Sequence, residues 1–253
     1  MTTETAKTSL LEVVDLHTHF NTSRGVAAAV DGVSFSLERG CMIGIVGESG
    51  SGKSVLSRTI IDILPHDGSV SYSGKVMFEN KDLRTLSQSD MRAIRGRDIA
   101  MVFQDPMTSL KPVMKIGKQI TEVLTLRCGL SKSEAQERAV ELLHDVGIPE
   151  PKQQLSRFPM HLSGGMRQRV AIAIAIALAG EPKLLIADEP TTALDVSIQA
   201  QILNLLRKLQ TERNMAVIII SHNLGIISEY AVSIVTHDLK TPQPLAGDNQ
   251  FNE

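Results

Sequence analysis

The run Gly47–Ser54 has the residue types and spacing of a loop that wraps around phosphate groups. It fits the pattern G-x-x-x-x-G-K-[ST], directly follows the apolar run Met42–Val46 and precedes the helical pattern Val55–Leu64. This is the strand–loop–helix setting that the motif needs. Glycines let consecutive backbone N–H groups point at phosphate oxygens, and the helix start adds positive potential. A chance match to the bare pattern is expected in about 1% of chains of this length and composition, so the sequence predicts a site for Mg-ATP.

Within this loop, Lys53 is expected to reach the β- and γ-phosphates, and the Ser54 hydroxyl is expected to ligate Mg2+. The nucleotide-binding residues expected here are Gly47, Glu48, Ser49, Gly50, Ser51, Gly52, Lys53 and Ser54.

Two acids follow a second apolar run, Leu184–Ala187. An acid at the carboxyl end of a strand beside a phosphate loop is placed to hold the metal ion, and we assign this role to Asp188. Glu189 is expected to polarise a water in line with the γ-phosphate as a general base. The alternative is a pair of solvated acids that begin a turn before Pro190, and the phosphate loop makes this alternative the weaker one.

A second glycine-containing helix start lies at Leu162–Arg169, LSGGMRQR. The glycines after Ser163 open a helix whose first-turn amides form a further anion site. A chain that binds one ATP has no evident use for two such sites. We therefore expect Ser163, Gly164 and Gly165 to face the γ-phosphate that a partner subunit holds. The alternative is an N-capped helix start that binds nothing.

Composition and charge exclude several other functions. The chain has 253 residues, 42% of them hydrophobic, with a net charge of −2, which describes a globular protein without the basic field of a nucleic-acid binder. Its two cysteines, Cys41 and Cys128, are interpreted as reduced thiols of a cytosolic protein. The longest apolar run, Val170–Ala179, is half the roughly 20 residues that a membrane span needs, and the first residues do not resemble a signal peptide.

Short apolar runs alternate with helical patterns, which predicts an α/β fold with a largely parallel sheet. The expected strands are Met42–Val46, Asp98–Phe103, Lys183–Ala187 and Met215–Ile220. From about Ile116 to Ala179 the pattern is helical throughout. Ser131 and Glu134 form a capping box before a helix that runs through Leu143. We interpret this stretch as a helical insertion.

Together these motifs resemble those of the ATP-binding cassette (ABC) ATPases. GESGSGKS and LLIADEP are similar to the family's two phosphate and magnesium motifs, and LSGGMRQR is similar to its signature. Phe103–Pro106 resembles the Q-loop, Ala193–Asp195 the D-loop, and His222 the switch histidine. The resemblance implies a P-loop NTPase fold: an ABC-type nucleotide-binding domain at 1–231, with a mixed sheet and a helical subdomain at about 113–180.

The resemblance also implies roles for single residues. Gln104 would contact Mg2+ and the attacking water, close to a membrane partner. Ser163 and Gly165 would bind the γ-phosphate of the opposite protomer's ATP, and Asp195 would help to join the two sites. His222 would hydrogen-bond the γ-phosphate, a role that suits imidazole; the alternative is a surface histidine at a strand end.

An aromatic residue before the phosphate loop would stack on the adenine. Phe20 is the candidate, because stacking needs only a π-face. His17 and His19 lie close to it in the sequence, and Phe35 is the alternative core residue.

The run Phe103–Pro112, FQDPMTSLKP, resembles importers of the dipeptide, oligopeptide and nickel group, although Lys111 stands where that group more often has Asn. Such subunits work in pairs, homo- or heterodimeric, on the cytoplasmic face of the bacterial inner membrane. They sit beneath membrane-spanning permease subunits that a substrate-binding protein supplies. The alternatives are a soluble cassette outside transport and a cassette that binds ATP but turns it over poorly. The transported solute stays open, because selectivity lies in other subunits.

The resemblance ends after Ala231, where the family continues with a strand of the type DRVxVMxxG. Here Val232–Val235 begins like a strand, and a polar sequence that contains Pro and Gly follows. We expect 232–253 to be a divergent, disordered tail. It would be either a natural short variant or the product of a disrupted gene, and in both cases we expect lower stability or activity.

Overall fold

The computed structural model describes residues 9–23, 25–95, 97–105, 109–180, 182–192, 194–231, 233–236 and 243–244. The chain divides into two units. The first unit contains the residues up to Ser87 together with those from Ala216 onward, and the second contains Gln88–Met215.

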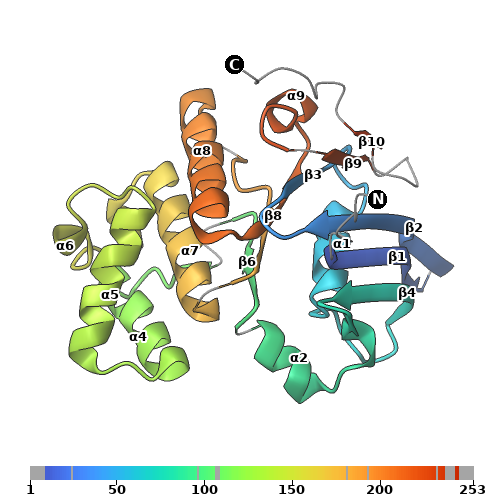
Figure 1. Cartoon of the computed structure of the whole chain (residues 1–253), viewed down its shortest axis with the longest axis horizontal. Coiled ribbons are helices and arrows are strands. Elements are labelled where there is room, and N and C mark those ends of the chain that lie inside the picture. Colours follow the sequence, from blue (N-terminus) through green and yellow to red (C-terminus); the bar gives the residue numbers. More distant parts are fainter. Residues whose placement is uncertain are drawn as a thin grey trace, which may run out of the picture. The chain divides into compact units, whose positions relative to one another are not determined.

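An antiparallel sheet opens the first unit (Figure 1). Its strands lie in the order β2, β1, β4, β5, and each pair of neighbours is antiparallel. Their bounds are β1 Ser9–Thr22, β2 Gly25–Glu38, β4 Val70–Phe78 and β5 Lys81–Asp82. The sequence patterns did not predict these strands. Bulges interrupt the β1–β2 register, and Asp15 within β1 has a positive φ of 47°, so the regular apolar–polar alternation that marks a strand is lost.

The parallel strands of the first unit are β3 Met42–Val46, β8 Ala216–Ser221 and β9 Ser233–Thr236. β3 pairs with both β8 and β9, and β10 Gln243–Pro244 pairs antiparallel with β9. Every residue of β3 and β8 is buried. Gly44 lies in the middle of β3, where an added Cβ would come within 2.1 Å of Ile227 Cγ2. Glycine at this position therefore lets helix α9, Leu224–Ile227, pack directly on the strand.

Helix α1, Lys53–Ile60, packs on the antiparallel sheet of the same unit. Its contact with β1 includes a buried hydrogen bond between the Thr18 and Thr59 hydroxyl oxygens, 2.9 Å apart. The helix is shorter than the predicted Val55–Leu64. Asp62, two residues after the end of the helix at Ile60, has a left-handed φ of 53°, so the helix cannot continue through it. One 3-10 turn, η1 Leu83–Thr85, completes the first unit.

The second unit contains two parallel strands, β6 Ile99–Val102 and β7 Leu184–Asp188. Asp98, 4% exposed, lies just before β6 and joins the two strands. Its carboxylate accepts hydrogen bonds from Arg97 and is 3.0 Å from Lys183 Nζ, while its backbone oxygen accepts from the Lys183 and Leu184 amides. The strands are those predicted, with ends that differ by one residue.

Helices make up the rest of the second unit, and 116–179, which is described throughout, contains no strand. The Ser131–Glu134 capping box is present, as predicted. In Figure 1, α4, α5 and α7 lie beside one another. The helices are α2 Gln88–Arg95, α4 Ile116–Cys128, α5 Lys132–Asp145, α6 Pro151–Gln154, η2 Pro159–His161, α7 Gly164–Ala179 and α8 Val196–Arg213.

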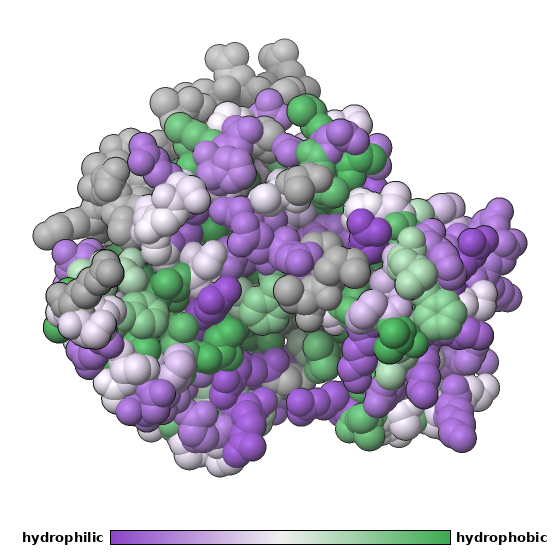
Figure 2. All heavy atoms as spheres, turned by 180° about the vertical axis from the view of Figure 1, so that it is seen from behind, coloured by the Kyte–Doolittle hydropathy of each residue, from purple (hydrophilic) through white to green (hydrophobic). Residues whose placement is uncertain are grey.

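On the face seen in Figure 2, hydrophobic side chains form small separate patches among hydrophilic ones. Among the described residues, no helix has both the length and the hydropathy to cross a membrane. The strand-like start predicted at 232–235 overlaps β9, Ser233–Thr236, and Val232 lies outside the described residues. Apart from β10, the rest of the predicted tail, 237–242 and 245–253, lies outside the described residues.

Candidate functional site

The loop Gly47–Ser54 curls around the amino group of Lys53. This side chain is 4% exposed, and its Nζ donates to the Gly47 carbonyl oxygen at 2.8 Å and to the Glu48 carbonyl oxygen at 2.6 Å. Gly50 and Gly52 have φ values of 85° and 86°, which residues with a side chain rarely adopt. The glycine spacing thus fixes the curl, and backbone oxygens hold the lysine charge inside it.

The start of α1 follows this loop directly. Gly52 is its N-cap residue in the left-handed conformation, with no side-chain cap and no acid in the first turn. The first amides of a helix have no partner within the helix, and the helix dipole adds positive potential there. Together with Lys53, these groups favour an anion at the loop.

His222 lies at the end of the strand next to this loop. β3 and β8 pair in parallel, with Val46 opposite Ser221, so Gly47 and His222 follow adjacent strand ends. The Ser221 hydroxyl accepts a hydrogen bond from the Asn223 amide at 3.0 Å, and this bond shapes the backbone around His222. The structure therefore brings the predicted switch histidine next to the phosphate loop.

In the second unit, Gln104 and Glu189 are in direct contact. Gln104 follows β6 and Glu189 follows β7, and the Gln104 Nε2 donates to Glu189 Oε2 at 2.8 Å. The Thr192 hydroxyl donates to the same carboxylate oxygen, also at 2.8 Å. Two donors thus fix the direction of the acid that we predicted to be the general base.

The backbone at this point departs from ordinary geometry. Asp188, the last residue of β7, is 1% exposed, and Glu189 has a φ of 47°. A positive φ at a residue other than glycine stores strain, and such residues are concentrated at functional sites. The chain therefore changes direction sharply at the second of the two acids, for which we predicted different roles.

Ser163 caps the signature helix α7. Its hydroxyl accepts from the Met166 amide at 3.3 Å, which is N-cap geometry. The two glycines that follow also have a packing role. An added Cβ at Gly165 would lie 2.6 Å from Ile198 Cγ2, and one at Gly164 would lie 3.1 Å from Leu194 Cδ2. Their small size lets α7 begin directly against α8 and the segment before it.

Two further predicted residues, Asp195 and Phe20, lie at the start of α8 and on β1. Asp195 is exposed at the start of α8, and its backbone oxygen accepts from the Ile198 and Gln199 amides. Phe20 is half-buried near the end of β1, opposite Ala27 of β2 and Val70 of β4. Ala193 of the predicted D-loop and Pro106 of the predicted Q-loop lie outside the described residues.

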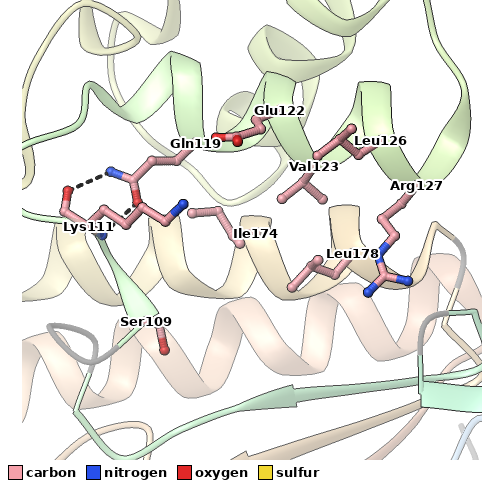
Figure 3. A pocket seen from close by; sticks show the side chains of 9 residues that line it. All are labelled: Ser109, Lys111, Gln119, Glu122, Val123, Leu126, Arg127, Ile174 and Leu178. Carbon is pink, nitrogen blue, oxygen red and sulfur yellow. Dashed lines mark hydrogen bonds between the residues drawn. The ribbon is translucent and has the colours of Figure 1, made fainter. Parts of the chain in front are cut away.

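Sequence reasoning missed Thr192 and also missed Gln119. The buried amide of Gln119 accepts from the Lys111 amide at 2.8 Å and donates to the Lys111 and Met114 carbonyl oxygens. It thereby fixes the segment that follows the Q-loop against α4 (Figure 3). A lone glutamine carries no motif, so only the fold reveals this role.

Beside this anchor, α4 and α7 form an open groove of about 290 Å³ (Figure 3). Apolar side chains face one another across it, and charged ones lie around them. Leu126 is 76% exposed and Leu178 is 38% exposed. The lining residues are Ser109, Lys111, Gln119, Glu122, Val123, Leu126, Arg127, Ile174 and Leu178.

Comparisons with known proteins agree with this architecture. The family described as "ABC transporter" matches residues 30–192. The oligopeptide transport ATP-binding protein OppD of Bacillus subtilis is 54% identical over 224 residues, which cover 88% of this chain. The peptidoglycan transport ATP-binding protein YejF of Agrobacterium fabrum is 50% identical over 228 residues, or 90% of this chain. The chain spans only 62% and 41% of the lengths of these two relatives.

Solved structures show the same fold. The ATP-binding cassette MJ0796, in a dimeric post-hydrolysis state bound to ADP and Pi, aligns with a TM-score of 0.78 at 27% identity. The alignment covers 94% of this chain and 99% of that one. Since the family's sequence pattern matches more than half of the chain and the cassette fold is the same, this protein belongs to the ABC transporter family.

Proposed function

We propose that the chain binds Mg-ATP and hydrolyses it as the energy-coupling subunit of a peptide importer. The observation that carries this proposal is the phosphate loop, where backbone oxygens hold the Lys53 amino group inside a curl that opens at the start of α1. A buried cation beside the first-turn amides of a helix suits a polyphosphate. Phe20 supplies the face on which adenine stacks.

Mg2+ suits the donors that the motifs supply. The Ser54 hydroxyl, the Gln104 amide oxygen and the Asp188 carboxylate are all oxygen ligands, the kind that Mg2+ prefers. Bound there, Mg2+ would offset the negative charge of the phosphate oxygens.

The catalytic assignments are Glu189, Gln104 and His222. Glu189 accepts a proton from the water that attacks the γ-phosphorus, and the bond to the ADP oxygen breaks. The Gln104 and Thr192 donors direct the Glu189 carboxylate, so the base is oriented before the water arrives. His222 hydrogen-bonds the γ-phosphate and keeps it in line for this reaction.

We propose that two such chains, or this chain and a similar subunit, enclose two ATP molecules between them. Ser163, Gly164 and Gly165 of one protomer contact the γ-phosphate bound to the other, and Asp195 joins the two sites. Val196, next to Asp195, is 77% exposed, and this exposed apolar side chain supports an interface at this point. MJ0796 is a dimer in its solved structures, which supports the same arrangement.

The proposed transported solute is a peptide, because the oligopeptide transporter subunit is 54% identical to this chain. Permease subunits are the proposed membrane partners, with a substrate-binding protein as an indirect one. The proposed contact of the permease subunits is with the groove between α4 and α7, whose exposed leucines offer an apolar surface. This assignment puts the chain on the cytoplasmic face of the membrane.

The test is Glu189→Gln in the full chain. Without a base, the variant is expected to bind ATP, to lose at least about 100-fold in phosphate release, and to accumulate as an ATP-bound dimer. Light scattering with and without Mg-ATP measures the dimer, and a phosphate assay measures turnover.

Lys53→Ala is the matched control, because it removes the phosphate-binding charge and leaves Glu189 in place. It is expected to bind ATP weakly and to stay monomeric with ATP. A wild-type chain that binds no nucleotide would overturn the whole proposal. If the wild-type chain binds ATP without hydrolysing it, only the binding part survives.

A further inference from the structure

We propose that His17, His19 and Asp31 form a binding site for a divalent transition-metal ion of the zinc class. The ligand atoms of these three side chains all lie within 4.8 Å of one another. They form the one such group found among the described residues of the chain. The site lies on the antiparallel sheet of the first unit, and the proposal does not depend on ATP hydrolysis.

The strand geometry directs both histidines to the same side of the sheet. His17 and His19 stand two residues apart on β1, and side chains at this spacing share a face. Thr18 between them is fully buried and bonded to Thr59 of α1, so the histidines face away from that helix. Their rings are 6.0 Å apart, centre to centre. Both are half-buried and within reach of an ion from solution.

A β-bulge supplies the third ligand. Leu16 pairs with Val33 and Thr18 with Val30, so Asp31 and Gly32 of β2 together lie opposite His17. Gly32 has a φ of 68°, as expected for a bulge built on a left-handed glycine. The extra residue turns Asp31 toward His17, and Asp31 Oδ1 lies 2.9 Å from His17 Nδ1.

The second nitrogen of His17 faces another carboxylate. Its Nε2 is 3.1 Å from Asp15 Oδ1, and Asp15 has a positive φ. Histidines that bind metals commonly donate their other ring N–H to a carboxylate, which fixes the ring. Asp15 thus acts as a positioning residue. The Gly32 amide also reaches His17 Nδ1, at 3.2 Å, so the ion replaces this long hydrogen bond.

The donor set selects the class of ion. Two imidazole nitrogens and one carboxylate oxygen suit Zn2+, Cu2+ or Ni2+, whereas Mg2+ and Ca2+ prefer oxygen ligands alone. The Asp31 side chain is 74% exposed, so one side of the site is open to solvent. Water or an external ligand then completes a tetrahedral zinc site.

The experiment is a Zn2+ titration of the full chain, purified without a polyhistidine tag and stripped with a chelator. A chromophoric zinc chelator competes for the ion, and Mg2+ is present in excess. We expect one tight zinc per chain. His19→Gln and Asp31→Asn should each weaken zinc binding more than tenfold, and Asp15→Asn should weaken it by about 10- to 100-fold.

His66→Gln is the matched control, since His66 also stands on the surface of the first unit and beside an acid, with its Nε2 3.2 Å from Asp62. This variant and Cys128→Ser should bind zinc like the wild type. X-ray absorption at the zinc edge should show two imidazole ligands and no sulfur. Sulfur ligation would overturn the proposal, and so would equal zinc affinity in the His19→Gln variant and the wild type. It would also be overturned if the wild type bound less than one zinc per chain.

Discussion

The carboxylate of Glu189 receives two hydrogen bonds at a single oxygen, from Gln104 and from Thr192. A general base works only if its lone pair is directed at the proton that it takes. The Gln104 bond comes from another segment of the unit, but the Thr192 bond comes from the turn that follows Glu189 itself. Local turn geometry and longer-range packing therefore fix the same carboxylate.

Thr192→Val tests the local part of this arrangement. The variant keeps the side-chain shape and loses the hydroxyl donor, so Glu189 becomes less well oriented. We expect about tenfold slower phosphate release with ATP affinity unchanged, measured by steady-state assay and nucleotide titration. Thr192→Ser keeps the hydroxyl and should retain most activity. Equal turnover in the Val variant and the wild type would contradict the positioning role.

The sequence predicted Glu189 but could not predict Thr192. An acid pair after an apolar strand is a pattern with a chemical meaning, whereas a threonine three residues later is an ordinary turn residue. For Lys53 the sequence predicted a place in a phosphate-binding loop, because the glycine spacing leaves the backbone few other conformations. Its burial and its bonds to the Gly47 and Glu48 carbonyl oxygens were not predicted.

At the scale of the elements, the first turn of α7 packs tightly on α8. The contact of Gly165 with Ile198 permits no side chain larger than hydrogen without movement. A glycine in the first turn of a helix normally costs stability relative to alanine. Here the packing reverses that expectation, since an alanine methyl would overlap a β-branched side chain that has little freedom to move.

Gly165→Ala is expected to destabilise the protein by about 1–3 kcal/mol, which is typical of overpacking. Gly164→Ala is the control, because its methyl would meet only the flexible end of Leu194 at 3.1 Å. Urea unfolding measures both variants. Adding Ile198→Ala to Gly165→Ala should cost less than the sum of the two single changes, because the clash disappears. Strict additivity would disprove the contact as the cause.

The contribution of Asp98, at the junction of β6 and β7, to the stability of the fold depends on pH. Burial opposes ionisation of the Asp98 carboxyl, but the hydrogen bonds and charges of Arg97 and Lys183 outweigh it, and its pKa lies below the ordinary value. The folded state therefore favours the carboxylate. The resulting stability is complete above the unfolded pKa of about 3.9 and is lost as the pH falls through the lower folded value.

Asp98→Asn should therefore lower the free energy of unfolding clearly at pH 7 and less at pH 3. Urea unfolding of the variant and the wild type across this range measures the difference. If the variant and the wild type differed in free energy of unfolding by the same amount at pH 7 and at pH 3, the ionised form of Asp98 would contribute nothing to stability.

Parallel strands were predictable from sequence, but the antiparallel sheet was not. The predicted Met42–Val46 coincides with β3, and the predicted Asp98–Phe103 contains β6, because strands buried on both faces appear as continuous apolar runs. β1 and β2 have one exposed face and contain bulges at Asp15 and Gly32. The bulges shift the alternation, so the period of two that identifies such strands is lost.

At the scale of the whole molecule, the proposed assembly needs a membrane partner as well as a second cassette. Leu126 projects an apolar side chain, 76% exposed, into the groove beside α7. A charge there would weaken docking of an apolar segment without touching the residues that bind ATP. A charge in the groove therefore tests contact with the permease separately from ATP hydrolysis. A change in the phosphate loop would alter ATP binding itself and could not separate the two.

The Leu126→Glu variant should keep ATP binding and basal hydrolysis. When it is used to capture partners from detergent-solubilised membranes, the amount of permease recovered should fall at least about tenfold. Mass spectrometry of the captured proteins provides the measurement. Val113→Glu is the control, since Val113 is 86% exposed and does not line the groove. Equal recovery with both variants would place the membrane contact elsewhere.

Helix α7 has a mechanical consequence. Ser163 caps one end of it, while Ile174 and Leu178 near the other end line the groove. Its 16 residues make a rod about 24 Å long, and tight packing at Gly165 leaves it little room to slide on α8. One continuous helix therefore joins the groove to the predicted signature motif and sets a fixed length between them.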